Sequence, residues 1–155
     1  MNTTDYLNWM TTMPLGNHPY DYKGTDRVIT SHDRSRKKKH VGKNNGCCTI
    51  MRYRVDGVII RQHTACDFIL TNEGTRTAYL IEFKGSKIAE GAVQLMTTAD
   101  DLKSELEHYK ALKFRIIASR CKTHQLEDIA VKKLRRRYRK ADQVVIEEQK
   151  FEEDI

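Results

Sequence analysis

The sequence has no apolar run that approaches the roughly 20 residues needed by a membrane-spanning helix, and its first residues show no apolar segment of the signal-peptide kind. Its four cysteines form no CxxC pair, so the usual spacing of a zinc ribbon is missing. A zinc site built from these thiols and a histidine such as His63 remains an alternative. Free thiols and the missing membrane signals together predict a cytoplasmic protein without a membrane partner.

No internal repeat and no shift in composition divides the chain, and 155 residues is the length of one domain. We therefore expect a single domain over residues 1–155. Hydrophobic residues make up 39% of the chain, which is enough for a compact core, whereas 32% are charged and must cover the surface. The net charge of +7 predicts an anionic partner, with nucleic acid first and an anionic membrane surface second.

Residues 66–85, CDFILTNEGTRTAYLIEFKG, have the pattern of a β-hairpin around which the rest of the chain is arranged. Gly74 and Thr75 are predicted to form its two-residue turn, because Gly readily adopts positive φ. In that register Asp67 lies opposite Glu82, and side-chain alternation places Lys84 on the same face. The other face is apolar and is expected to pack against a helix; it consists of Phe68, Leu70, Tyr79, Ile81 and Phe83.

Two carboxylates at facing positions of a strand pair repel each other, which destabilises a sheet by up to about 1 kcal/mol. A divalent cation would offset that repulsion, and Mg²⁺ or Mn²⁺ prefers carboxylate and backbone carbonyl oxygens. Asp67, Glu82 and the Phe83 carbonyl are therefore candidate metal ligands, and Lys84 could reach a water or phosphate oxygen beside the metal. A solvent-exposed strand face of mixed charge is the alternative interpretation.

An Asp, a hairpin and an apolar run that ends in Glu-x-Lys resemble the PD-(D/E)XK nuclease superfamily. The matching residues are Asp67, Glu82 and Lys84, the last two within YLIEFKG. Gln94 falls on the following helix, where many members carry a Gln near the site. The resemblance covers roughly residues 49–119. It implies a restriction-endonuclease-like fold and catalytic roles for all four residues.

Two departures from the superfamily pattern affect the site. Cys66 stands where a Pro commonly precedes the Asp. Many members also have an acidic residue on an upstream helix, but no Glu occurs here before Glu73. That upstream role is either empty or falls to an Asp such as Asp26 or Asp33.

The resemblance implies a Mg²⁺-dependent nuclease that hydrolyses phosphodiester bonds, with DNA favoured over RNA as the substrate. A catalytically inactive nucleic-acid-binding module of the same fold is the alternative, because a fold can persist after its chemistry is lost. The breadth of the superfamily also allows a nuclease that a partner holds in check. A single domain with a small cleft is compatible with a homodimer that grips a duplex from two sides.

Periodicity outside the hairpin predicts the other elements of an α/β fold. Asp56-Gly57 is expected to join two antiparallel strands, and the alternative is that Asp56 is a second acidic ligand at the site. Ser86 is expected to cap a helix of about 20 residues or more. The expected strands are 48–55, 58–62, 114–119 (parallel to a hairpin strand after a helical crossover) and 144–146 (at an edge), and the expected helices are 6–10, 88–109 and 126–140. Together they predict a central mixed sheet, with antiparallel hairpins plus a parallel crossover strand, flanked by helices.

Basic residues concentrate in two segments. Residues 31–46 contain almost no apolar side chain and are predicted to be a mobile loop that clamps phosphates. The second segment is the end of the last predicted helix, and an acidic tail, 147–155, is expected to fray. A solvated surface without function is the alternative for both basic segments. The candidate nucleic-acid-binding residues are Arg34, Arg36, Lys37, Lys38, Lys39, Lys87, Arg135, Arg136, Arg137 and Arg139.

Overall fold

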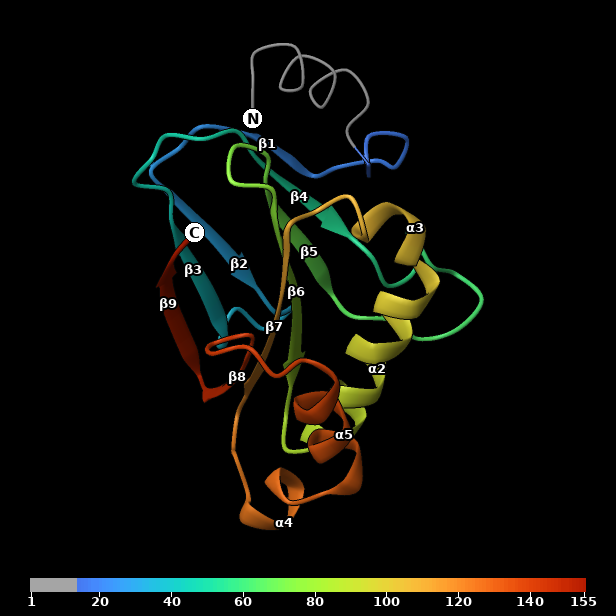
Figure 1. Cartoon of the computed structure of the whole chain (residues 1–155). Helices are drawn as coiled ribbons and strands as arrows, with labels where there is room; N and C mark the ends of the chain where they lie inside the picture. The colour runs from blue at the N-terminus through green and yellow to red at the C-terminus, as the bar shows by residue number, and fades with distance from the viewer. Residues whose placement is uncertain (1–13) are drawn as a thin grey trace.

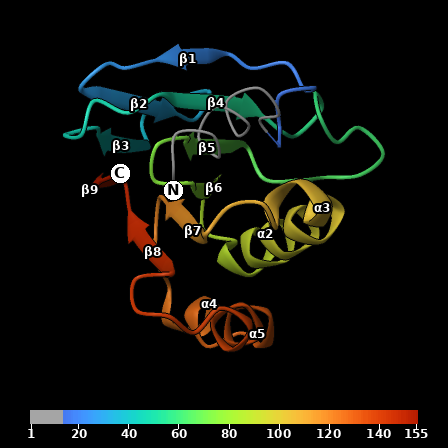
Figure 2. The same cartoon turned by 45° about the horizontal axis from the view of Figure 1, so that its top comes forward.

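The structure, a computed structural model, describes residues 14–155, and the short helix predicted at 6–10 lies outside them. It has three layers, namely a three-stranded sheet, a six-stranded sheet and a layer of helices (Figures 1 and 2). The mixed sheet and its flanking helices confirm the predicted α/β class. Within the described residues, no helix combines the length and the apolar character that crossing a bilayer requires.

The six-stranded sheet has the order β1-β4-β5-β6-β7-β8. Its first four strands pair antiparallel, and the last two follow parallel to β6. The strands are β1 (Tyr22–Gly24), β4 (Ile50–Arg54), β5 (Phe68–Asn72), β6 (Thr77–Lys84), β7 (Ala111–Ala118) and β8 (Val144–Glu148). The predicted crossover strand and the predicted edge strand are therefore confirmed as β7 and β8. Residues 58–62 do not form the predicted strand, because the chain after β4 folds into turns.

The central hairpin has the predicted register. Phe68 of β5 faces Ile81 of β6, and Leu70 faces Tyr79. The predicted two-residue turn is wrong, because four residues connect the strands and the positive φ (59°) falls on Arg76. The loop is stabilised by the Asn72 side chain, whose Oδ1 accepts hydrogen bonds from the two amides that follow Glu73.

The helices are shorter than periodicity predicted. They are α2 (Ile88–Asp101), α3 (Lys103–Leu106), α4 (Thr123–Leu126) and α5 (Ile129–Arg137). The long predicted helix breaks at Leu102, and its N-cap is Lys87 rather than Ser86, without a side-chain capping bond. In the last helix, Asp128 is the N-cap and accepts from the Ala130 amide.

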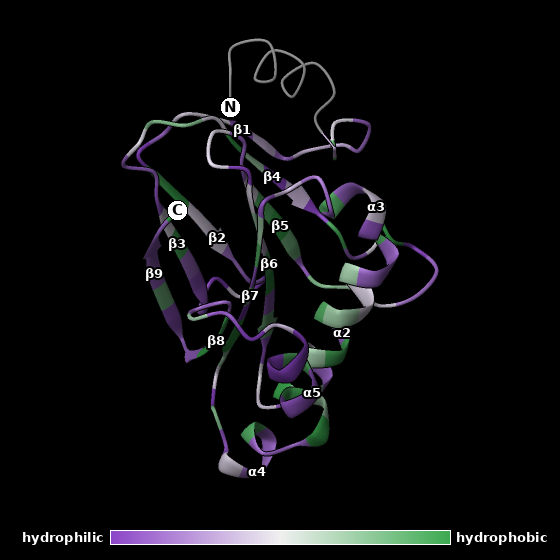
Figure 3. Ribbon diagram, in the orientation of Figure 1, coloured by the Kyte–Doolittle hydropathy of each residue, from purple (hydrophilic) through white to green (hydrophobic). Residues whose placement is uncertain are grey.

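α2 packs on the opposite face of the hairpin from the one predicted. Ile69, Ala78 and Leu80 lie in one core with the buried side of α2 and α5. Both faces of these strands are apolar, so the sequence pattern alone did not decide between them. Figure 3 shows this distribution, with hydrophobic residues along the central strands and α2 and hydrophilic residues over much of α5 and β9.

The three-stranded sheet covers the face where α2 was expected. Its strands are β2 (Val28–His32), β3 (Lys39–Lys43) and β9 (Lys150–Asp154), in the order β2-β3-β9. Ile29 and Phe151 pack against Phe68, Tyr79 and their neighbours to form a second core. The mobile loop predicted at 31–46 is therefore wrong, since only the turn at 33–38 and the link after β3 lack regular structure. The frayed tail at 147–155 is also wrong, because β9 pairs in parallel with β3.

Gln149 connects β8 of the large sheet to β9 of the small one with a positive φ of 63°. Its amide donates to Ala118 of β7, and its carbonyl accepts from Lys39 of β3. The main chain at this single residue therefore bonds to both sheets and fixes the corner between them.

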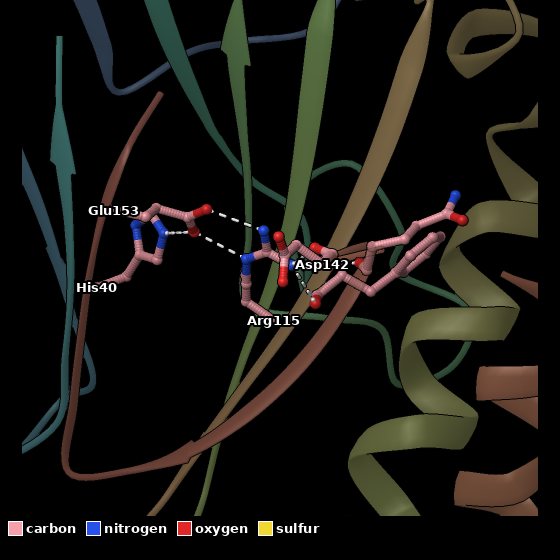
Figure 4. A network of polar contacts seen from close by, with 6 residues as sticks. His40, Arg115, Asp142 and Glu153 are labelled. Atoms are coloured by element: carbon pink, nitrogen blue, oxygen red, sulfur yellow. Dashed lines mark hydrogen bonds and ion pairs between the residues drawn. The ribbon is translucent and has the colours of Figure 1, made fainter. Parts of the chain in front are cut away.

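A buried charge network joins the same layers (Figure 4). Arg115 of β7 is 1% exposed and donates from Nε and Nη2 to the two carboxylate oxygens of Glu153, at 2.7 and 2.8 Å. His40 of β3 lies 2.7 Å from Glu153 Oε2 through Nε2. Arg115 Nη1 also donates to the carbonyls of Phe114, Asp142 and Gln143. The hydrogen bonds of Arg115 lower the pKa of Glu153 to about 2 against the effect of its burial.

Candidate functional site

A pocket of about 450 Å³ lies where β4 and β6 end and β5 begins, beside the turn that joins β2 to β3. Its lining contains three aspartates, and we call the part formed by Arg34, Lys38 and Arg54 the basic wall. Its lining residues are His32, Asp33, Arg34, Ser35, Lys38, Arg54, Asp56, Asp67, Phe68, Phe83, Lys84 and Gly85. Of the predicted catalytic and metal-binding residues, Asp67, Phe83 and Lys84 therefore line one pocket.

Asp67 and Glu82 lie next to each other at the end of the central hairpin. The Asp67 amide donates to Glu82 Oε1 at 3.2 Å, and the Phe83 amide donates to Asp67 Oδ2 at 2.8 Å. Each carboxylate thus accepts a hydrogen bond from the main chain of the other strand. These two bonds extend the hairpin beyond its last backbone pair and fix both side chains in place.

Lys84 completes the predicted trio. Its Nζ lies 3.6 Å from Glu82 Oε2 and 3.8 Å from Glu90 Oε2 at the start of α2. Glu82 is 2% exposed and lies behind the pocket wall rather than in it. Burial, with the neighbouring Asp67 as the next cause, raises the pKa of Glu82 to about 10, so this carboxyl holds a proton at neutral pH.

Gly91 of α2 lets the helix approach these side chains closely. A Cβ at this position would lie 3.2 Å from Lys84 Cγ and 3.5 Å from Glu82 Cγ. This contact explains a glycine in a helix interior, where Gly costs roughly 1 kcal/mol relative to Ala. Gln94, one turn further along α2, does not line the pocket, and its Oε1 is buried without a hydrogen-bond partner among the described residues.

Glu82→Gln is expected to remove a pH dependence of stability. Because the folded-state pKa of Glu82 is raised above its ordinary 4.5, the folded protein holds a proton there that the unfolded chain releases. Its contribution is complete below about pH 4.5 and is lost as the pH rises toward 10, by up to about 1.4 kcal/mol per pH unit. Urea unfolding at pH 6 and pH 8.5 in chelator should show wild type losing more stability than the variant.

Glu90→Gln is the matched control, since Glu90 lies near Lys84 but is exposed on α2. It should keep the pH slope of the wild-type protein. Parallel stabilities of wild type and Glu82→Gln over this range would show that Glu82 is ionised in the folded protein.

The residues at the hairpin end suit a hard divalent cation in their donor chemistry. Asp67 and Glu82 offer carboxylate oxygens that lie close enough to repel each other when both are ionised. The Phe83 amide points toward Asp67, and in an extended strand the carbonyl of the same residue faces the same edge. Within residues 14–155, no cluster of three or more His, Cys, Asp or Glu side chains is placed to hold a metal. A cation here would therefore complete its coordination with waters.

The turn between β2 and β3 places only some of the predicted basic residues at the pocket. Arg34 and Lys38 line it, whereas Arg36, Lys37 and Lys39 do not. Lys38 Nζ pairs with Asp33 Oδ2 at 3.0 Å and donates to Ser119 Oγ at 3.1 Å.

Lys87 and the basic residues of α5 do not line the pocket. Arg137 pairs with Asp100 of α2, and Arg135 donates to the Val144 carbonyl at 3.3 Å. Arg136 and Arg139 are exposed, and Arg139 Nε donates to the Arg136 carbonyl. Ile129, the first residue of α5, is 79% exposed.

Sequence reasoning missed His32 and Arg54 as pocket residues and assigned Asp56 to a hairpin turn. Asp56 lines the pocket, and its Oδ1 accepts from the Ala65 amide at 3.1 Å. Of the two candidates for an upstream acid, Asp33 lines the pocket and Asp26 does not. The only local signal was the β-branched run Val28–Thr30, which favours a strand but does not indicate that His32 lies at the pocket.

Comparison of the chain with protein-family models, with curated proteins and with solved structures found no match. The function of the site is therefore inferred from its residues and their geometry.

Proposed function

We propose that the protein is a Mg²⁺- or Mn²⁺-dependent nuclease that hydrolyses phosphodiester bonds, with DNA favoured over RNA. The observation that supports this is that Asp67 and Lys84 line one pocket together with the basic wall, and that Glu82 lies beside both of them behind the pocket lining. The PD-(D/E)XK resemblance assigns catalytic roles to the same three residues.

Asp67, Glu82 and the Phe83 carbonyl would hold the cation. When bound, the ion lowers the pKa of a coordinated water and polarises the phosphoryl oxygen. Glu82 would release its proton on binding, because the cation offsets the burial and repulsion that raise its pKa. Lys84 would orient the attacking water and stabilise the negative charge that develops on the phosphate.

The rest of the pocket would bind the substrate backbone. The net charge of +7 attracts a polyanion, and Arg34 and Arg54 at the pocket would contact phosphates. The exposed basic residues of α5 and Lys87 would contact the backbone only outside the pocket. A homodimer and a cytoplasmic location remain predictions from the sequence.

A second candidate is a nucleic-acid-binding module without hydrolytic activity. It is favoured by the position of Glu82, which is buried behind the pocket wall with a raised pKa, and by the lack of a third clustered acid among residues 14–155. In that case Lys84 and Glu82 would stabilise the hairpin end, and the basic wall alone would interact with nucleic acid.

The two candidates are separated by one set of incubations. Purified protein is incubated with end-labelled single- and double-stranded DNA and RNA, with Mg²⁺, with Mn²⁺ and with chelator. We expect shortened products with either metal, none with chelator, and faster cleavage of DNA. Metal-independent binding without products would instead support the second candidate.

A further inference from the structure

We propose that the β2–β3 turn and the end of β4 form a second phosphate subsite in the pocket, in which Arg34, Arg54 and His32 bind the phosphate next to the one that is cut. The identification of its ligand as a nucleic-acid phosphate rests on the function proposed above. Three features of the pocket lining support the subsite, and none of them involves Asp67, Glu82 or Lys84.

The first feature is the fixed shape of the turn. Asp33 accepts hydrogen bonds from the Lys38 amide and from the Ser35 hydroxyl, and its main-chain carbonyl accepts from the Arg36 amide. Lys38 also links the turn to Ser119 at the end of β7. Because Lys38 is held by these partners, it positions the turn instead of binding the ligand. The main chain of the turn that carries Arg34 is therefore held in a fixed shape before a ligand binds.

The second feature is positive charge that the protein does not neutralise. Arg34 is exposed, and no ion pair is formed by it within the part of the chain that the structure describes. Arg54 shares the carboxylate of Asp21 with Arg52, so one acid faces two guanidinium groups. The Arg54 guanidinium lies over the Phe68 ring, 5.3 Å from its centroid, and its side chain is 61% exposed. Planar guanidinium groups match phosphate oxygens in geometry.

The third feature is the state of His32. Its Nδ1 is buried without a hydrogen-bond partner among the described residues, and leaving a buried polar group unpaired costs about 1–3 kcal/mol. Burial is the main cause that lowers the pKa of His32, and Arg36 and Lys39 on its own hairpin and Arg52 of β4 act in the same direction.

Asp33 is the acid beside His32 that opposes this shift. Because the pKa is lowered overall, the imidazole is neutral at pH 7, and the charged groups around it are mainly cations. A phosphate in this position would supply the missing negative charge and favour the protonated ring. Ligand binding and proton uptake by His32 are therefore coupled.

The test uses the full chain in chelator, where no strand is cut, and a fluorescein-labelled single-stranded DNA of 12 nucleotides. Anisotropy titrations at several salt concentrations compare wild type, Arg34→Gln and Arg61→Gln. Arg61 is also an exposed arginine and does not line the pocket, so its variant loses the same charge without touching the subsite. We expect Arg34→Gln to bind several-fold more weakly and to reduce the salt slope by about 0.7, the value for one phosphate contact on a single strand.

A second readout follows the His32 ring by NMR, with His32→Gln to assign its resonance. Saturation with the same DNA should raise the pKa of His32 by about one unit or more, and less in Arg34→Gln. Equal salt slopes for Arg34→Gln and Arg61→Gln, or an unchanged pKa of His32 at saturation, would overturn the subsite.

Cleavage assays with Mg²⁺ separate this proposal from the function itself. Binding that depends on Arg34 without any cleavage by the wild-type protein supports the subsite and overturns hydrolysis. Metal-dependent cleavage by Arg34→Gln at the rate and salt slope of Arg61→Gln supports hydrolysis and overturns the subsite.

Discussion

Lys84→Ala is expected to lower the rate of metal-dependent strand cleavage by on the order of 10²–10³-fold, the usual loss when a preorganised charge-stabilising group is removed. The structure gives the physical reason, since Lys84 lines the pocket and its Nζ is held 3.6 Å from Glu82. Stability should change by no more than about 1 kcal/mol, because the neighbouring Glu82 holds a proton at neutral pH and Glu90 is exposed, so little charge attraction is lost. The measurements are single-turnover cleavage and urea unfolding of the same preparations.

Lys103→Ala provides the control, because Lys103 is an exposed lysine on α3 that does not line the pocket. It should cleave as the wild-type protein does. Asp67→Ala and Glu82→Gln should abolish cleavage while the fold survives. Cleavage that persists unchanged in Asp67→Ala would rule out the assignment of Asp67 as a metal ligand.

Arg115→Met is expected to destabilise the protein by about 3–5 kcal/mol, the usual cost of removing one partner of a buried ion pair. Met keeps a side chain about as long as the aliphatic stem of Arg, so the loss comes mainly from the missing guanidinium charge and its hydrogen bonds. Without the guanidinium, Glu153 keeps His40 as its partner among the described residues, and the carbonyls of Phe114 and Asp142 lose the Arg115 donor. The Gln143 carbonyl also loses Arg115 but still accepts from the Phe114 amide. Urea unfolding at pH 7 measures this loss, and a change below 1 kcal/mol would show that the network contributes little.

The double variant Arg115→Met/Glu153→Gln tests whether charge is the cause. It should be less destabilised than the sum of its two single variants, because the uncompensated carboxylate is removed as well.

The same carboxylate affects stability in acid. The folded-state pKa of Glu153 is depressed to about 2 from 4.5, so its contribution is present above about pH 4.5 and is lost as the pH falls toward 2. Glu153→Gln should therefore lose stability less steeply than wild type over that range. Glu147→Gln, which removes an exposed acid from β8, should retain the wild-type slope.

The hairpin register could be predicted because the alternation around residues 66–85 is regular and a slip by one residue would mix its two faces. The three-stranded sheet could not be predicted from the sequence. β3 reads KHVGK and β9 reads KFEED, and in both the residues that pack inward are few and lie between charges. Strands of this kind are defined by long-range pairing and by Arg115, which neutralises Glu153 inside the core.

In the candidate site, too, the features set by local pairing could be predicted, and those set by long-range packing could not. The proximity of Asp67 to Glu82 follows from local strand pairing, so the sequence was sufficient for it. The burial of Glu82 depends on α2, which the sequence placed on the wrong face. His32 and Arg54 join the pocket through contacts between the two sheets, which no local pattern encodes.

The corner at Gln149 has a consequence for how the protein folds. His40 and Glu153 are 113 positions apart in the chain, and the strands that carry them pair directly. Such distant pairing is slow to form, because the intervening chain must first be ordered. The β2–β3 hairpin that carries Arg34 can form early, because its strand pairs are local in the sequence. The three-stranded sheet is complete only when β9 pairs with β3, so the part of the pocket that depends on this sheet is expected to reach its final position after the β5–β6 hairpin has formed.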